Sequence, residues 1–158
     1  MSKTFCVGDI HGSYRGLIQV LERSNFDKQE DILICIGDVA DGWSEVSECI
    51  EELLTIKNLI PILGNHDYWL RNYLEYGCQP EIWLKQGGQA SMENYIRNPE
   101  LKIKHRDVYF PKCIMYYIDN NQNAYVHGGY KSKRGLGDDS QGLVSDWDLP
   151  LHKDLRDC

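Results

Sequence analysis

Short apolar runs alternate with longer amphipathic segments through the first half of the chain. Three of the runs have the length of β-strands, and they cover Thr4–Val7, Ile32–Ile36 and Leu59–Leu63. The second is an unbroken apolar run, which is typical of a strand buried on both faces. Helical patterns separate the three runs. This alternation predicts parallel strands joined by right-handed crossovers.

The helical segments carry recognisable start and stop signals. Ser13 is the predicted N-cap of a first helix that runs to about Arg23, and Ser44 is the predicted N-cap of a second helix. A third helix is expected to begin near Asp67 and to end at Gly77, since glycine is the usual residue at a left-handed helix end.

The segment between residues 78 and 112 has a less regular pattern. Pro80–Arg97 looks helical but is interrupted at Gly87-Gly88, which predicts two short helices with a break between them. Trp83 is expected to pack in the core, and His105 is expected to lie on the surface between two basic residues.

A β-hairpin is predicted after this segment. Cys113–Ile118 and Ala124–Val126 flank Asp119–Asn123, a run of turn-forming residues. The hairpin places His127 at the end of its return strand. The polar, glycine-rich stretch Lys131–Gln141 is predicted to be a loop.

Polar turns follow each of the predicted strands. They are Gly8-Asp9-Ile10-His11-Gly12, Gly37-Asp38-Val39-Ala40-Asp41-Gly42, Gly64-Asn65-His66-Asp67 and His127-Gly128-Gly129. Because the carboxyl ends of parallel strands meet at one edge of a sheet, these side chains are expected to lie together.

Carboxylate, amide and imidazole groups are ligands suited to manganese, iron or zinc. The expected metal ligands are Asp9, His11, Asp38, Asn65 and His127. Asp38 has two carboxylate oxygens to share between two ions. Two ions about 3.5–4 Å apart can clamp a phosphoryl group and activate water.

Composition limits the other functions that the chain could have. Its 158 residues fit a single domain covering positions 1–158, and its net charge of −7 argues against a nucleic-acid partner. No apolar run is long enough for a membrane span, and no signal peptide is evident, so a cytoplasmic location is expected. Cys6, Cys35 and Cys113 lie in apolar runs and are predicted to be buried.

Four motifs in order, G-D-I-H-G, G-D-V-A-D-G, G-N-H-D and V-H-G-G, resemble the calcineurin-like metallophosphoesterases. Within that superfamily they are most similar to the phosphoprotein phosphatase branch, which includes bacterial and phage serine/threonine phosphatases and diadenosine tetraphosphatases. The resemblance covers about residues 4–130. It implies an α/β fold in which a two-sheet β-sandwich is flanked by helices.

The resemblance also implies a role for each motif residue. Asp9, His11 and Asp38 would bind a first ion, and Asp38, Asn65 and His127 a second. Manganese is the expected metal, with iron or zinc as alternatives. A hydroxide bridging the two ions would attack phosphorus.

The third motif would supply the acid of the reaction. His66 would protonate the leaving group. Asp67 would orient the His66 imidazole and favour its charged form. Asn65 and His66 would contact the substrate. Asp41, which matches the second Asp of the family's G-D-x-x-D-R-G motif, would support the site from behind the ligands.

Three features depart from the family pattern. Gly42 and Leu63 stand where many relatives have phosphate-binding arginines, which should weaken phosphomonoester binding or change substrate preference. Arg71 could substitute, although a solvated position on a helix is the expected one. A later G-H motif is also missing: Asp146-Trp147-Asp148 resembles the segment before it, but His152 lacks the glycine context. The chain is therefore expected to stop short of the family's last strands.

Three functions remain open. The first is a metal-dependent phosphatase acting on phosphomonoesters, including phosphoserine or phosphothreonine in proteins. The second is a hydrolase of dinucleoside polyphosphates such as diadenosine tetraphosphate. The third is an inactive module that binds a metal or a phosphorylated ligand. The sequence does not specify an oligomeric state.

Overall fold

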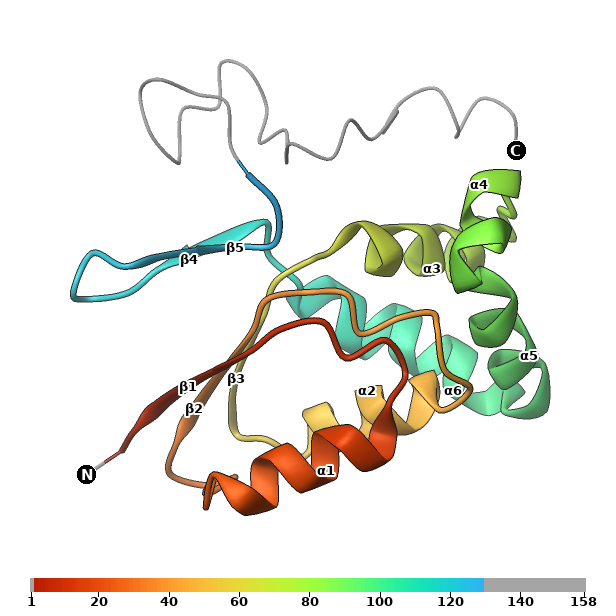
Figure 1. Cartoon of the computed structure of the whole chain (residues 1–158). Coiled ribbons are helices and arrows are strands. Elements are labelled where there is room, and N and C mark those ends of the chain that lie inside the picture. Colours follow the sequence, from red (N-terminus) through yellow and green to blue (C-terminus); the bar gives the residue numbers. More distant parts are fainter. Residues whose placement is uncertain (1, 130–158) are drawn as a thin grey trace.

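The computed structural model describes residues 2–129, and its N-terminal part is built around a three-stranded parallel sheet (Figure 1). Strands β1 (Thr4–Val7), β2 (Ile32–Cys35) and β3 (Asn58–Pro61) pair in the order β1-β2-β3. Thr4 pairs with Ile32, which in turn pairs with Asn58. The predicted parallel strands are therefore confirmed, although β3 begins one residue earlier and ends two residues earlier than expected.

Helices connect the strands and make up most of residues 62–129. They are α1 (Tyr14–Arg23), α2 (Val46–Leu54), α3 (Asn65–Tyr76), α4 (Glu81–Trp83), α5 (Gln89–Arg97) and α6 (Pro99–Lys104), with the short turns η1 (Leu84–Gly88), η2 (His105–Tyr109) and η3 (Phe110–Lys112).

The helix ends agree only in part with the sequence signals. Gly77 ends α3 with a φ of +75°, as predicted for a left-handed C-cap. Ser13 precedes α1 but makes no side-chain cap hydrogen bond. The prediction for Ser44 is wrong, because α2 begins after Glu45. The Ser44 carbonyl instead accepts a hydrogen bond from the Asn94 side chain at 2.8 Å.

A second sheet lies on the other side of β1–β3 from helix α1 (Figure 1). Strands β4 (Tyr116–Ile118) and β5 (Ala124–Val126) pair antiparallel, as predicted for the hairpin. The hairpin is tied to the end of β3 because the Leu63 N–H donates to the Ile114 carbonyl at 2.8 Å. The expected α/β fold with two sheets and flanking helices is confirmed.

The core lies between the parallel sheet and the helices. Leu33, Ile34 and Cys35 of β2 are almost completely buried, which confirms that this central strand is covered on both faces. The predicted burial of Cys6 is wrong: β1 is the edge strand, and Cys6 points to its uncovered face. Cys113 is half-buried.

His105 is fully buried, so its predicted surface position is also wrong. The Tyr95 hydroxyl lies 2.7 Å from His105 Nδ1, and Glu51 Oε1 lies 2.8 Å from Nε2. These contacts join α2, α5 and η2. Burial lowers the pKa of His105, although its bond to Glu51 opposes that shift.

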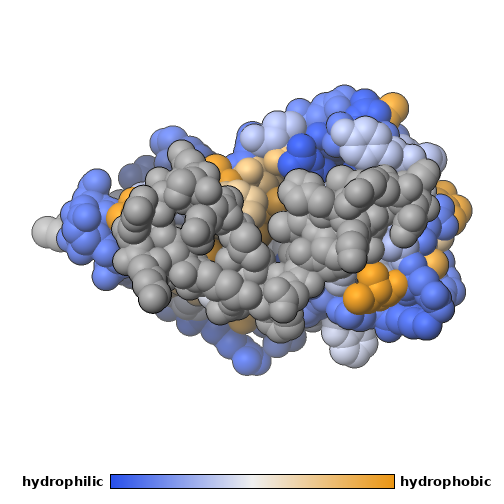
Figure 2. Space-filling view, turned by 90° about the horizontal axis from the view of Figure 1, so that it is seen from above, coloured by the Kyte–Doolittle hydropathy of each residue, from blue (hydrophilic) through white to orange (hydrophobic). Residues whose placement is uncertain are grey.

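The visible surface is mainly hydrophilic, with hydrophobic residues in small separate patches (Figure 2). Across residues 2–129, none of the helices has the length and apolar character that a membrane span requires. The predictions for Lys131–Gln141, Asp146–Asp148 and His152 lie outside the described residues.

Candidate metal centre

The turns after β1 and β2 lie side by side, as the parallel topology predicts (Figure 1). The N–H groups of Ile10 and His11 both donate to the Asp38 carbonyl at 2.9 Å, and Gly12 N–H donates to the Val39 carbonyl at 2.9 Å. These bonds fix the first polar turn against the second.

Four side chains meet at the carboxyl ends of the strands. Asp38 Oδ2 lies 3.2 Å from His127 Nε2 and 3.9 Å from His11 Nε2. Asn65 Oδ1 lies 3.2 Å from His127 Nε2. We call His11, Asp38, Asn65 and His127 the ligand cluster. One oxygen of Asp38 thus lies between the two imidazoles, a position suited to bridging two ions.

Backbone carbonyls set the orientation of both histidines. His11 Nδ1 lies 2.9 Å from the Ala40 carbonyl, and His127 Nδ1 lies 2.8 Å from the Ile36 carbonyl. A carbonyl can only accept, so Nδ1 carries the proton in each ring. In the neutral imidazoles Nε2 then keeps its lone pair for a cation, as in most metal-binding histidines.

The cluster attracts positive charge. Burial disfavours a charged His127, but its hydrogen bond to Asp38 and the charges of Asp38 and Asp9 raise its pKa to about 9. Burial likewise opposes ionisation of Asp38, yet the bond from His127 keeps the pKa of Asp38 below its usual value. A proton on His127 and a metal cation at the cluster would thus be stabilised by the same oxygen atoms, those of Asp38 and Asn65.

The donor set fits divalent ions such as manganese or zinc, because it offers carboxylate and amide oxygens together with imidazole nitrogen. Neighbouring ligands of an octahedral ion lie about 3 Å apart. This is close to the 3.2 Å that separates His127 Nε2 from Asp38 Oδ2 and from Asn65 Oδ1. Asp9 is exposed at the end of β1, and no hydrogen bond or ion pair within residues 2–129 joins it to the cluster. Its expected role as a ligand stays a prediction.

Three residues of the site have backbone conformations that are rare without glycine. The φ angles of His11, Asp38 and Asp41 are +48°, +52° and +69°. Such angles cost free energy and persist when surrounding contacts impose them. The turns are therefore shaped for the positions of their side chains rather than for local stability.

The side chains of Asp38 and His127 fit against Gly64 and Gly37 because glycine has no Cβ atom. A Cβ atom on Gly64 would lie 2.1 Å from Asp38 Oδ1. Gly37 has a φ of +98°, and a Cβ there would lie 2.8 Å from His127 Nδ1. Any side chain at either position would displace a member of the ligand cluster.

Asp67, which was predicted to orient the His66 imidazole, makes no hydrogen bond to that ring. Its carboxylate instead accepts hydrogen bonds from four backbone N–H groups at 2.7–3.0 Å, those of Asp38, Val39, Ala40 and Gly64. Burial and the nearby charge of Asp38 raise the pKa of Asp67 to about 6, while the amide bonds act in the opposite direction. Asp67 therefore joins the second polar turn to the third.

The partner of His66 is Asp41, whose Oδ2 lies 2.7 Å from His66 Nδ1. Burial disfavours a charged imidazole, but this bond and the charges of Asp38 and Asp41 raise the pKa of His66. His66 packs edge-on against His11, with ring centroids 4.9 Å apart. Ligand atoms of His11, Asp38 and His66 all lie within 4.8 Å of one another.

Two residues from the segment after α3 complete the site and were not predicted for it. Trp83 Nε1 donates to Asp41 Oδ2 at 2.7 Å, and Ser91 Oγ donates to Asp41 Oδ1 at 2.6 Å. The expected core packing of Trp83 is confirmed, since it is fully buried. Its hydrogen bond to Asp41 depends on tertiary contacts that periodicity does not reveal.

Arg71 does not take the place of the absent arginines. It lies on the outer face of α3, with its Nε 3.8 Å from Glu75 Oε2. The expectation of a solvated helix position is confirmed.

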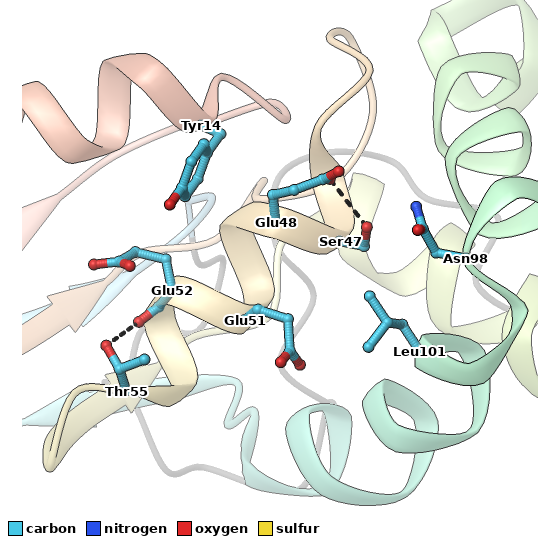
Figure 3. Close-up of a pocket in the computed structure, with 8 residues that line it drawn as sticks. All are labelled: Tyr14, Ser47, Glu48, Glu51, Glu52, Thr55, Asn98 and Leu101. Carbon is cyan, nitrogen blue, oxygen red and sulfur yellow. Dashed lines mark hydrogen bonds between the residues drawn. The ribbon is translucent and has the colours of Figure 1, made fainter.

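A separate cavity of about 390 Å³ lies between α1, α2 and α6, away from the ligand cluster (Figure 3). Its lining includes Glu48, Glu51 and Glu52 of α2. Each of these carboxylates already has a partner: Ser47 and Asn94 for Glu48, Lys104 and His105 for Glu51, and Lys28 for Glu52. The acidic groups therefore stabilise the packing of the helices.

The fold and the cluster of His, Asp and Asn residues agree with the family that sequence comparison identifies. Residues 2–154 match the calcineurin-like phosphoesterase family, and the chain belongs to it. The resemblance found in the four motifs is therefore confirmed.

Two curated relatives illustrate the range of this similarity. The chain is 36% identical over 78 residues to a symmetrical bis(5'-nucleosyl)-tetraphosphatase of Coxiella burnetii, covering 49% of this chain and 26% of that protein. It is 33% identical over 82 residues to serine/threonine-protein phosphatase 1 of Salmonella typhimurium, covering 52% and 37%. The matches thus span well under half of each relative.

A solved structure supports the fold. The crystal structure of a protein assigned as a diadenosine tetraphosphatase superposes with a TM-score of 0.63 at 18% identity, covering 90% of this chain and 55% of that one. At this identity the similarity concerns the fold alone.

Proposed function

We propose that the protein is a metal-dependent hydrolase of phosphoric esters, acting on phosphomonoesters and using two divalent ions. The observation that supports this most directly is the placement of His66. Its Nδ1 is engaged by Asp41, so Nε2 is available beside a cluster of oxygen and nitrogen donors. A proton donor beside side chains that can bind metal ions is an arrangement suited to ester cleavage.

The ions would supply positive charge against the phosphoryl oxygens and lower the pKa of water. Manganese is our proposed metal. Asp9, His11 and Asp38 would hold the first ion, and Asp38, Asn65 and His127 the second.

The remaining steps belong to side chains of this chain. Asn65, whose Oδ1 faces His127, would keep its amide N–H₂ for a phosphoryl oxygen. His66 would deliver the proton on Nε2 to the leaving oxygen. The Asp41 carboxylate would stabilise the imidazolium, and its bond to Nδ1 would fix Nε2 as the nitrogen that faces the substrate.

A second candidate activity is the hydrolysis of dinucleoside polyphosphates. The 36% identity to a bis(5'-nucleosyl)-tetraphosphatase favours it. So do Gly42 and Leu63, because they cannot supply the bidentate contacts to a terminal phosphate that arginines at these positions would make.

The two activities separate in a direct comparison of turnover. Metal-loaded protein is incubated with a phosphoserine peptide and, in parallel, with diadenosine tetraphosphate, and released phosphate and nucleotides are quantified. We expect turnover of the peptide. Turnover of the dinucleotide alone would replace the first proposal with the second. Metal binding without turnover of either would indicate a binding module.

Other expectations from the sequence remain predictions. They are a single domain over residues 1–158, a cytoplasmic location and the absence of a nucleic-acid partner.

A further inference from the structure

We propose that Trp83 and Ser91 are positioning residues for the hydrolysis, because they hold the Asp41 carboxylate in the orientation that directs His66 toward the ligand cluster. The inference rests on the proposed function of His66 as the general acid. It assigns a role at the site to the segment of α4, η1 and α5, which carries none of the four motifs.

The contacts fix Asp41 from both sides. Oδ2 accepts from His66 Nδ1 and from Trp83 Nε1, each at 2.7 Å. Oδ1 accepts from Ser91 Oγ at 2.6 Å, and the Asp41 N–H donates back to the same hydroxyl at 3.0 Å. Asp41, Trp83 and Ser91 are all completely buried.

Both oxygens must be engaged for the carboxylate to act as a rigid partner. The terminal torsion of an Asp side chain is broad, so one bond to His66 would leave the carboxylate plane free to rotate. A buried carboxylate without donors would also carry a large desolvation penalty. Trp83 and Ser91 remove both problems, and neither side chain ionises near neutral pH.

The backbone between the two residues is built to bring them to Asp41. Gly87 has a φ of +101°, and a Cβ there would lie 2.8 Å from the Gly42 nitrogen. A Cβ on Gly88 would lie 2.4–2.5 Å from ring atoms of Trp83. Because these two residues have no Cβ atom, the backbone at Gly88 can pack closely on the Trp83 indole and the backbone at Gly87 against the Asp41–Gly42 turn.

Leaving-group dependence separates a positioning role from a purely structural one. Phenolate leaves poorly and needs the proton from His66, whereas p-nitrophenolate leaves without much help. If Asp41 is misaligned, phenyl phosphate should be affected far more than p-nitrophenyl phosphate. General loss of structure would lower both rates together.

The variants are Ser91→Ala and Trp83→Phe, each compared with the wild type in metal-loaded form. Ser91→Thr retains the hydroxyl and should restore activity. Ser47→Ala is the matched control, since Ser47 is an equally buried serine whose hydroxyl donates to Glu48 on α2. We expect Ser91→Ala and Trp83→Phe to lower kcat on phenyl phosphate at least about tenfold, with KM and the p-nitrophenyl phosphate rate changing less than about threefold.

A spectroscopic readout makes the test independent of turnover. In metal-free protein, the hydrogen-bonded Nδ1 proton of His66 should give a downfield ¹H–¹⁵N signal in the wild type and in Ser47→Ala. We expect this signal to shift or broaden in Ser91→Ala and Trp83→Phe. Equal losses on both substrates, or an unchanged His66 signal in both variants, would overturn the inference. If the wild type turns over neither substrate, the proposed function fails and the His66 signal alone decides.

Discussion

At the scale of single residues, buried carboxylates determine how the site is organised. Asp38, Asp41 and Asp67 come from two adjacent turns but have different partners. Asp38 lies between two imidazoles and accepts one backbone N–H, Asp41 binds one imidazole and two neutral side-chain donors, and Asp67 accepts four backbone N–H groups. The residue types and turns of the site could be predicted from sequence, because short polar motifs follow the strands. The pairing of His66 with Asp41 rather than Asp67 could not, since it depends on how the turns fold over one another.

Replacing Asp67 with alanine should destabilise the protein strongly. Four buried N–H groups would lose their acceptor, and we expect the free energy of unfolding to fall by about 3 kcal/mol or more. Denaturant unfolding measures this. Glu75→Ala, on the exposed face of the same helix, should change it by less than about 0.5 kcal/mol. Similar effects of the two substitutions would argue against a structural role for Asp67.

His105 should make stability depend on pH. Its pKa is lowered in the folded state by burial, so the unfolded chain binds the proton more readily. The stability contribution is present above the unfolded pKa of about 6.5 and is lost as the pH falls below that value. The Glu51 carboxylate pairs with both His105 and Lys104, and its bridge to Lys104 does not involve the group replaced in His105→Gln. We expect this variant to lose less stability than the wild type between about pH 7 and pH 5. Parallel pH profiles would contradict the assignment.

At the scale of elements, regular patterns were predictable and irregular ones were not. β1, β2 and the β4–β5 hairpin were expected because apolar runs and turn residues mark them locally. The break at Gly87-Gly88 was also predicted, but the number of short helices through Lys112 was not. Buried polar groups such as Ser91 and His105 determine that region through contacts with α2 and the Asp41 turn, and periodicity does not encode these contacts.

The β3–α3 turn offers a test of how the elements shape the ligand cluster. Gly64→Ala would place a Cβ against Asp38 Oδ1, so Mn²⁺ affinity measured by titration calorimetry should fall at least about tenfold. Gly77→Ala is the matched control: its φ is +75° and its Cβ would meet no atom within 4 Å. That control should cost about 1 kcal/mol of stability and leave affinity unchanged. Wild-type affinity in Gly64→Ala would show that Asp38 does not bind the ion.

At the scale of the whole molecule, the parallel sheet collects residues that are far apart in the sequence. His11 and His127 lie at opposite ends of the described chain, yet both direct Nε2 toward Asp38. The net charge of −7 would disfavour a phosphate ester as substrate, and cations bound at the site would reverse the local field. The central claim is therefore that divalent ions at the ligand cluster make the protein an ester hydrolase.

Hydrolysis of p-nitrophenyl phosphate by metal-stripped protein, with and without Mn²⁺, beside Asp38→Asn, tests this claim most directly. We predict turnover that appears only with Mn²⁺ and falls at least about a hundredfold in Asp38→Asn, because the amide cannot supply the bridging charge. Turnover that is independent of metal, or an Asp38→Asn variant as active as the wild type, would contradict the account.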